Sequence, residues 1–372
     1  MRILNVVHGF PPFNMAGTEV YSYGLSLESS KRHSVNIFHR VDHLPEEDYS
    51  LSNKALDGLS VFMVNNTFRD CCLFEATYKN SFIDEKFGLV LDRIKPDIIH
   101  IHHLLYLSTG VIGQAKERRI PVVFTLNDYW LLCPQGQLLN NKLRPCRGLD
   151  YRKCVYCVIH QVAIRKNIFR IYYFLKNKCP RAVFNIAKSF YLNSFMILFL
   201  KIKSAQNLIK ERASHMKDIC SAVDLFIAPS GFLMDKFINS GIPEEKVILM
   251  RYGLNSRNFE KLEKIPSQRL RFGFIGSIIA AKGLHILIKA FNGIDKDAAE
   301  LKIYGECSSY KGILGDYLRY CRKISRNERV IFMGGFDNKD IVDIFGGIDV
   351  LVVPSIWYEN SPLVIQEAFL SR

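Results

Sequence analysis

Residues 348–369 have the sequence IDVLVVPSIWYENSPLVIQEAF, and this stretch sets the pattern for the whole chain. The apolar run Val350–Val353 predicts a buried strand, and the loop after it holds Glu359. A helix is expected next, with Ser361 as its N-cap and Pro362 as its first residue. A strand that passes through a loop into a helix is the repeating unit of parallel α/β sheets.

The same alternation of short apolar runs and helical patterns occurs along most of the chain. Further strands are expected at Ile3–His8, Ser34–Arg40, Leu59–Val64, Ile98–His102, Val122–Leu126, Leu225–Ala228, Val247–Met250, Leu270–Ile275, Ala299–Tyr304 and Val330–Met333. Helices are expected at Thr18–Glu28, Glu85–Ile94, Thr109–Arg118, Leu284–Asn292 and Ile341–Phe345. The predicted fold is therefore α/β, with two doubly wound domains at 1–258 and 268–372 and a polar linker at 259–267.

The positive charge of the chain is concentrated in one segment. The composition is ordinary for a globular protein, with 48% hydrophobic and 23% charged residues and a formal net charge of +14. Residues 145–217 hold 15 Lys and Arg against two acidic residues, Asp150 and Glu211. This distribution argues against a general nucleic-acid binder. It predicts a basic helical insertion that either packs on its own domain or, as we favour, binds an anionic membrane surface through about residues 160–203.

Other features of the sequence bear on location and metal binding. The N-terminus carries no targeting signal and no apolar run is long enough to span a membrane, so we expect a cytoplasmic protein, peripheral at the inner face of the membrane. Four of the ten cysteines, Cys133, Cys146, Cys154 and Cys157, lie within one irregular segment. They suit a structural zinc site, although their spacing is not that of a standard finger and buried cysteines without a metal are common.

The loop and helix at 354–369 form a candidate anion site. The backbone N–H groups of Leu363 and Val364, at the start of a helix that follows a strand, suit a phosphate or diphosphate. Glu359 precedes this site and Glu367 follows it, so two carboxylates can hold hydroxyl groups on either side of the phosphate. A nucleotide sugar has that layout. The alternative is a pair of surface glutamates on a helix and its cap.

Six segments in a characteristic order resemble the family 4 retaining glycosyltransferases, group 1, of GT-B fold. They are HGFPPFNMAGTEVY (8–21), PDIIHIHH (96–103), TLNDYWLLCPQGQLL (125–139), IAPSGF (227–232), FGFIGSIIAAKGLHILIKAF (272–291) and ENSPLVIQE (359–367). The last contains the Glu-x7-Glu motif of that family. The resemblance implies two Rossmann-like domains that face a cleft, the second one incomplete because the chain ends at Arg372 inside the expected helix.

The resemblance also implies roles for individual residues. Lys282 would neutralise the diphosphate leaving group with no cofactor required for catalysis, and Glu359 would hold the donor sugar. Glu367 would hold the ribose of the donor. The remaining donor-binding residues would be Gly17, Gly276, Ser277, Ser361, Leu363 and Val364. The acceptor side would include His102, His103 and Asp128, where packing of the histidines or a metal cluster with His100 are the alternatives.

Two residues depart from the family pattern. Asn127 stands where the family has a histidine, so a base is lost if that histidine takes a proton, whereas an amide suffices if it only positions the sugar. Asn127 is retained among the catalytic candidates. Ser277 stands where many relatives have an arginine, which leaves Lys282 with a larger share of the phosphate charge.

The expected function is transfer of a hexose from a nucleotide sugar to a glycan or lipid-linked acceptor, in polysaccharide or lipopolysaccharide synthesis at the cell surface. The rival is an inactive, truncated remnant that keeps nucleotide or membrane binding, which Asn127 and the early end of the chain favour. A glycosidase that uses Glu359 and Glu367 leaves Lys282 and the phosphate-type helix start unexplained.

Overall fold

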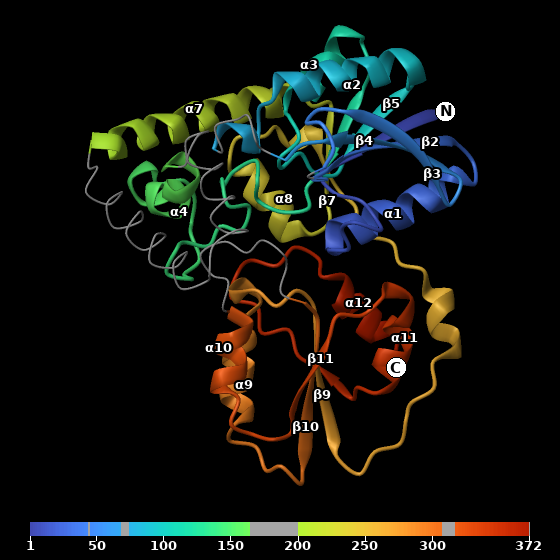
Figure 1. Ribbon diagram of the computed structural model, residues 1–372, viewed down its shortest axis with the longest axis vertical. Coiled ribbons are helices and arrows are strands. Elements are labelled where there is room, and N and C mark those ends of the chain that lie inside the picture. Colours follow the sequence, from blue (N-terminus) through green and yellow to red (C-terminus); the bar gives the residue numbers. More distant parts are fainter. Residues whose placement is uncertain (44, 68–73, 164–199, 307–316, 372) are drawn as a thin grey trace. The chain divides into compact units, whose positions relative to one another are not determined.

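The computed structural model describes residues 1–372 except 44, 68–73, 164–199, 307–316 and 372 (Figure 1). The chain divides into two compact units. Unit 1 comprises 1–136 and 147–251, and unit 2 comprises 137–146 and 252–372. The division at 251/252 lies before the expected domain end at 258, and a short 3₁₀ helix, Ser256–Lys261, occupies the start of the expected linker.

Unit 1 is built on an eight-stranded sheet with the order β3-β4-β2-β1-β5-β6-β7-β8. All pairs are parallel except β3 with β4. The strands are β1 (Arg2–Val7), β2 (Ser34–Val41), β3 (Leu51–Leu56), β4 (Leu59–Asn65), β5 (Ile98–Ile101), β6 (Val122–Thr125), β7 (Leu225–Ala228) and β8 (Val247–Leu249).

The edge strand β3 is absent from the sequence prediction. It pairs antiparallel with β4 through a turn at Asp57 and Gly58, whose φ angles are 47° and 80°. Two successive residues with positive φ form the tight hairpin turn that matches strand twist, and an Asp-Gly pair is a recognised signal for it. Three of the six residues of β3 are polar and four are exposed, so the strand lacks the continuous apolar run by which the other strands are recognised.

Helices cover both faces of the sheet of unit 1. Ile37 of β2 belongs to the apolar cluster that contains Tyr23 of α1, whereas the ring of the next residue, Phe38, contacts Phe87 of α2 at 5.0 Å. Alternate strand residues therefore bury against opposite layers, as in a doubly wound fold. The helices are α1 (Gly17–Ser30), α2 (Ser81–Ile94), α3 (Gly110–Glu117), α4 (Tyr151–Ala163), α7 (Leu200–Ala222) and α8 (Gly231–Ile238).

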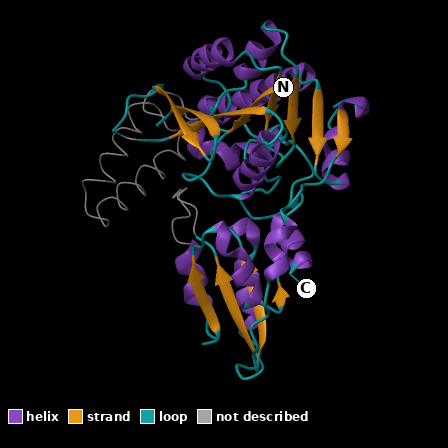
Figure 2. Ribbon diagram, turned by 90° about the vertical axis from the view of Figure 1, so that its right-hand side faces the viewer, coloured by secondary structure: helices purple, strands orange, loops and turns teal. Residues whose placement is uncertain are grey.

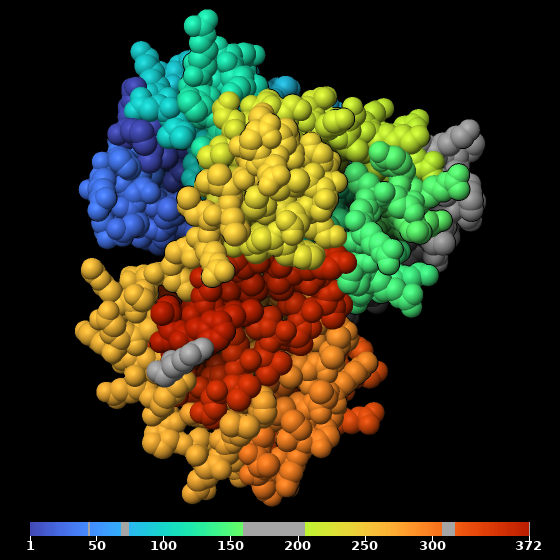
Figure 3. All heavy atoms as spheres, turned by 180° about the vertical axis from the view of Figure 1, so that it is seen from behind, coloured from blue at the N-terminus to red at the C-terminus, as the bar shows by residue number. Residues whose placement is uncertain are grey.

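The expected basic insertion is described only at its two ends. Helices α4 and α7 lie side by side (Figures 1 and 3). The middle of the expected insertion, residues 164–199, lies outside the described residues, and with it most of the segment expected to bind a membrane. No helix within the described part of the chain is long and apolar enough to cross a membrane.

Unit 2 holds a four-stranded parallel sheet with the order β11-β10-β9-β12 (Figure 2). One apolar cluster joins it to α9 and α10, and a second joins it to α11 and α12, so both faces are covered. The strands are β9 (Leu270–Ile275), β10 (Ala299–Tyr304), β11 (Val330–Gly334) and β12 (Val350–Leu351). The helices are α9 (Leu284–Phe291), α10 (Tyr317–Ile324), α11 (Ile341–Gly346) and α12 (Leu363–Leu370).

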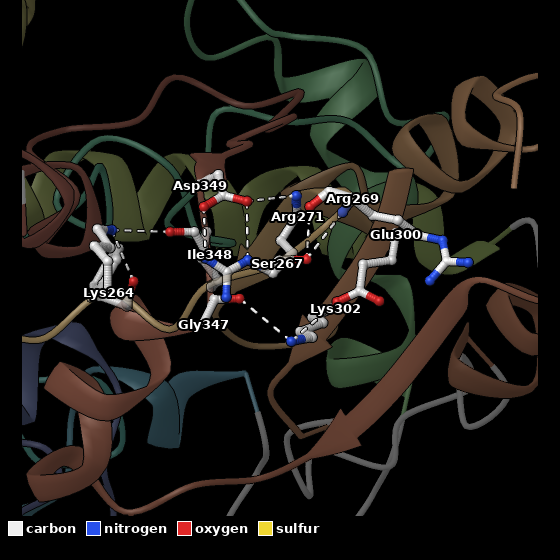
Figure 4. Close-up of polar contacts among 10 residues, drawn as sticks. Lys264, Ser267, Arg269, Arg271, Glu300, Lys302, Gly347, Ile348 and Asp349 are labelled. Atoms are coloured by element: carbon white, nitrogen blue, oxygen red, sulfur yellow. Dashed lines mark hydrogen bonds and ion pairs between the residues drawn. The ribbon is translucent and has the colours of Figure 1, made fainter. Parts of the chain in front are cut away.

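The amino ends of β9 and β12 are joined by an ion pair (Figure 4). The guanidinium of Arg271 donates to both carboxylate oxygens of Asp349, at 3.0 and 2.7 Å, and the backbone N–H of Arg271 donates to the same carboxylate. These bonds lower the pKa of Asp349. Lys264 donates nearby to the carbonyl oxygens of Phe345 and Ile348, both at 3.0 Å. At this end of the sheet, the polar contacts of Arg271 and Lys264 therefore hold neighbouring segments of unit 2 together.

Candidate active site

The order of the strands places the candidate donor-site residues of unit 2. In a doubly wound sheet, ligands bind outside the carboxyl ends of the strands where the strand order reverses. In unit 2 that point lies between β9 and β12. Lys282 lies in the short 3₁₀ helix Ala280–Lys282 after β9, and Glu359 lies in the loop after β12. The fold thus brings the two predicted residues to one place.

Three donors converge on a single carboxylate oxygen of Glu359. Lys282 Nζ lies 2.6 Å from Oε1, Ser355 Oγ 2.5 Å and Trp357 Nε1 2.8 Å. Lys282 Nζ also lies 5.3 Å from the centre of the Trp357 ring, within the range of a cation–π contact. The Lys282 and Glu359 side chains keep 26% and 20% of their surface exposed. An acidic group and a basic group are therefore held together while both remain accessible.

Two glycine contacts explain how the loops of this site approach each other. Gly283 has φ +70°, and a Cβ atom there would lie 1.9 Å from the carbonyl oxygen of Pro354. The backbone of Ile356 donates to Ala281, which fastens the two loops. At the ends of β9 and β10, a Cβ atom on Gly305 would lie 1.9 Å from the oxygen of Gly276. Only glycine fits either approach.

The start of the last helix differs by one residue from the prediction. Pro362, and not Ser361, is the N-cap of α12, and no side chain caps the helix. The Ser361 hydroxyl instead accepts a hydrogen bond from Gln366 at 3.0 Å. Proline at this position has ψ 121°, an extended conformation, so the helix starts at Leu363. The N–H groups of Leu363 and Val364 still occupy the first turn, whose amides have no partner within a helix.

Glu367 lies in α12 and is 9% exposed. Burial raises its pKa to about 7. It is therefore protonated over a wider pH range than an ordinary glutamic acid, which suits a group that exchanges hydrogen bonds with hydroxyls. Ser277 follows Gly276 directly after β9, so it lies, like Lys282, beyond the carboxyl end of that strand.

The acceptor-side candidates of unit 1 lie at the corresponding point of its own sheet. The strand order reverses between β1 and β5, and His102 and His103 directly follow β5. The ring of His103 hydrogen-bonds with Asp128, which follows β6, at 3.1 Å. His102 is fully buried. The Asn127 amide donates to the carbonyl of His102 at 2.8 Å, so it ties two strand ends together.

Gly17 is the first residue of α1, and an added Cβ atom would meet nothing within 4 Å. The space beside this helix start is open, as expected for a ligand that approaches the backbone. The neighbouring residues His8 and Glu19 were not singled out from the sequence, yet His8 Nε2 lies 3.2 Å from Glu19 Oε1, and the His8 ring lies beside that of His103. The position of His8 directly after the first predicted strand is the sequence signal that could have identified it as a candidate site residue.

The four cysteines of the expected zinc site are each partly buried. Across the part of the chain that the structure describes, no group of three or more His, Cys, Asp or Glu side chains is placed to hold a metal ion. The structure therefore does not gather Cys133, Cys146, Cys154 and Cys157 into a zinc site, nor His100, His102 and His103 into a metal cluster. His100 instead bonds the Thr125 hydroxyl at 2.7 Å.

Two parallel-sheet α/β units, each with polar residues at its strand-order reversal, define the GT-B class of proteins, and solved structures share this fold. HepE of Anabaena, in complex with UDP and glucose, matches with a TM-score of 0.59 and 15% identity over all of this chain and 78% of that one. Sucrose-phosphate synthase of Thermosynechococcus elongatus matches with a TM-score of 0.63 and 16% identity over all of this chain and 79% of that one.

Two family models match the chain, one in its N-terminal part and one in its C-terminal part. The model "Glycosyltransferase Family 4" matches residues 15–171, and the model "Glycosyl transferases group 1" matches residues 269–372. These matches support a glycosyltransferase of GT-B fold.

Two relatives match over nearly the whole of this chain. An uncharacterised glycosyltransferase of Methanocaldococcus jannaschii is 27% identical over 99% of this chain and 78% of that protein. An uncharacterised 42.6 kDa protein of the cps region of Klebsiella pneumoniae is 22% identical over all of this chain and 83% of that protein.

Proposed function

We propose that the protein transfers a hexosyl group from a nucleoside-diphosphate sugar to a glycan or lipid-linked acceptor, with retention of the anomeric configuration, in synthesis of a cell-surface polysaccharide or lipopolysaccharide. The observation that carries the proposal is the Lys282–Glu359 pair beside the start of α12. Structural neighbours in complex with UDP and with UDP-glucose support a nucleotide-sugar donor. The cps-region relative supports the polysaccharide context.

The proposed chemistry follows from the charges at this site. The diphosphate binds at the first amides of α12 and at Lys282, which exchanges its contact with Glu359 for the phosphate oxygens. Glu359 then accepts hydrogen bonds from hydroxyls of the donor sugar, and Glu367 binds the ribose. As the bond between the sugar and the diphosphate breaks, its electron pair leaves with the diphosphate, and Lys282 stabilises the developing charge.

The acceptor hydroxyl oxygen forms the new bond on the same face of the sugar. In this proposal its proton passes to the departing diphosphate, so no residue needs to accept a proton at position 127. Asn127 therefore serves as a positioning residue, in keeping with the hydrogen bond that its amide donates to the carbonyl of His102.

The test is a screen of the purified protein against UDP-, GDP-, ADP- and dTDP-linked hexoses, with and without glycan acceptors. We expect one donor class to be hydrolysed slowly and to be consumed faster with a suitable acceptor, and NMR of the product to show the donor's anomeric configuration. Binding of a nucleotide without turnover of any donor would instead identify the inactive remnant. Absence of nucleotide binding altogether would overturn the proposal.

Membrane attachment through about residues 160–203 is a separate part of the proposal. Its support is the concentration of Lys and Arg in 145–217, since each basic residue near an anionic surface contributes up to about 1 kcal/mol. We expect the protein to co-sediment with anionic vesicles at low salt, and less at high salt or with neutral lipid. Failure to bind anionic vesicles at low salt would assign the insertion to packing within unit 1.

A further inference from the structure

A buried arginine of α7 lies against the loop that follows β6. Arg212 is 1% exposed, and its Nη2 atom donates to the carbonyl oxygen of Trp130 at 2.6 Å. The guanidinium carbon lies 5.2 Å from the centre of the Trp130 ring and 5.5 Å from that of Tyr78, within the range of cation–π contacts. Within the described residues, its Nε atom is buried without a hydrogen-bond partner. The loop, through Trp130, therefore supplies most of the contacts that hold this cation.

The arginine keeps its positive charge although it is buried. Burial lowers the pKa of Arg212 to about 10, so the side chain is protonated at neutral pH, and Asp128 is among the groups whose charge favours this form. Burial of a cation is costly, and one charge-assisted hydrogen bond and two aromatic faces offset only part of that cost. Arg212 therefore contributes less to stability than to the fixed position of the Trp130 backbone.

Trp130 connects the arginine to the candidate acceptor site. Its backbone N–H donates to Oδ1 of Asp128 at 2.7 Å. Its ring centre lies 5.4 Å from that of His103, and Nε2 of His103 is hydrogen-bonded to Oδ2 of Asp128 at 3.1 Å. The Asp128 side chain is 27% exposed, and a carboxylate accepts about four hydrogen bonds, so it keeps capacity for a ligand hydroxyl. Movement of Trp130 would thus displace a group that a ligand can reach.

We propose that Arg212 is a positioning residue for the acceptor, which acts through Trp130 to hold Asp128 where its carboxylate accepts a hydrogen bond from an acceptor hydroxyl. The inference rests on the proposed function for the identity of that hydroxyl. A displacement of about 1 Å is enough to weaken a directional contact of this kind severely. Because Arg212 and Asp128 both belong to unit 1, loss of the arginine should change acceptor binding and leave the donor site of unit 2 intact.

The test compares Arg212→Met and Arg212→Lys with Lys246→Met in the purified protein. Lys246 is the control, because it donates to the carbonyls of Ser221 and Val223 at the other end of α7, at 2.8 and 2.9 Å. We expect Arg212→Met to raise the acceptor KM about tenfold while donor KM and donor hydrolysis stay within about twofold. Arg212→Lys should retain part of the wild-type affinity, because an ammonium can still donate to the carbonyl.

The control variant separates positioning from a general loosening of the helix. Lys246→Met should lower the thermal stability and leave the acceptor KM unchanged. An acceptor KM within about twofold of wild type in Arg212→Met would overturn the inference, as would an equal rise in the donor and acceptor KM values.

A second measurement does not depend on transfer. The chain has two tryptophans, Trp130 and Trp357, so in a Trp357→Phe background the fluorescence reports Trp130 alone. Trp130 is 2% exposed, and acrylamide should quench it weakly. Quenching should increase when Arg212→Met is added and stay unchanged when Lys246→Met is added. Equal quenching with and without Arg212→Met would overturn the inference. If no donor is turned over but quenching increases in Arg212→Met alone, the proposed function fails while the link from Arg212 to the loop stands.

Discussion

Two ion pairs lie at opposite ends of the neighbouring strands β9 and β12 of unit 2, and they are built differently. Arg271 uses two nitrogens to bind both oxygens of Asp349, and its side chain is only 5% exposed. Lys282 is one of three donors that share a single oxygen of Glu359, and it is 26% exposed. The planar guanidinium suits a fixed, bidentate contact, whereas an ammonium is a mobile point charge.

The comparison separates a contact that holds the sheet from one that a ligand can exchange. In Arg271–Asp349 both oxygens of the acid are occupied by the strand itself. In Lys282–Glu359, a phosphate can replace the carboxylate at the ammonium, because Ser355 and Trp357 still donate to Glu359. We therefore expect the first pair to govern stability and the second to govern chemistry.

The largest effect is expected at the second pair. Glu359→Ala and Lys282→Ala should each lower transfer by more than about 100-fold, roughly 3 kcal/mol of transition-state stabilisation, with little change in thermal unfolding. Steady-state rates and calorimetry measure the two quantities. Lys296→Ala is the matched control, because that lysine forms an exposed pair with Glu328 in the same unit. Rates within threefold of wild type for both site variants would remove the distinction and the donor-site assignment.

The next effect is expected at the first pair. Arg271→Met should lower the free energy of unfolding by about 2 kcal/mol, because it leaves Asp349 without the partner that replaces its hydration. Urea unfolding followed by tryptophan fluorescence measures the change. Transfer by the folded variant at low temperature should stay near the wild-type rate. A variant with normal stability but lost donor binding would place Arg271 in the site.

A smaller effect is expected from Gly283, which brings the Lys282 turn against Pro354. Gly283→Ala should reduce transfer about tenfold, equivalent to about 1.4 kcal/mol, because a methyl group at φ +70° meets the Pro354 carbonyl and displaces the loop of Glu359. Gly293→Ala is the control, since its Cβ would have an ordinary contact of 3.7 Å and no positive φ. Equal activities of the two variants would show that the loop approach has no part in the reaction.

The smallest effect is expected in the pH dependence of the free energy of unfolding, and its sign differs between Glu367 and Asp349. The pKa of Glu367 is raised to about 7, so its ionisation costs stability as the pH rises from its ordinary pKa toward 7. Glu367→Gln should therefore stabilise the protein by about 1 kcal/mol at pH 8 and leave it unchanged at pH 4.

The pKa of Asp349 is lowered, so its stabilisation is complete above its ordinary value and is lost as the pH falls. Asp349→Asn should thus destabilise at pH 8 and approach wild type under acid conditions. Unfolding curves at pH 4, 6 and 8 check both variants, and shifts of equal sign at pH 8 would contradict the contrast.

Much of the architecture was predictable because buried parallel strands are continuous apolar runs. Val122–Leu126 and Leu270–Ile275 were predicted nearly to the residue. The largely exposed strand β3 lacks this signal and was missed. The cap of α12 was wrong by one residue, because local propensity favours serine, whereas the extended Pro362 and the Gln366–Ser361 bond decide where the helix starts.

The candidate site was predictable to the level of residues but not of contacts. The motif at 359–367 and the Lys-Gly pair indicated Glu359 and Lys282 through a family resemblance. No local pattern indicated that the two side chains touch, that Ser355 and Trp357 join them, or that Gly305 is needed where it meets Gly276. His8 and Glu19 were overlooked for the same reason, since neither residue is unusual until the fold places it beside His103.

The sequence by itself determined the succession of strands and helices, the division into two α/β units and the loops that carry the polar residues, because hydrophobic periodicity and turn chemistry act over a few neighbouring residues. The tertiary structure alone decided which of those loops meet. Lys282 and Glu359 are 77 residues apart in the chain, and only the pairing of β12 beside β9 brings them within 2.6 Å. Strand order is set by the packing of the whole unit. The contacts at the point where the strand order reverses therefore cannot be predicted from any short stretch of the sequence.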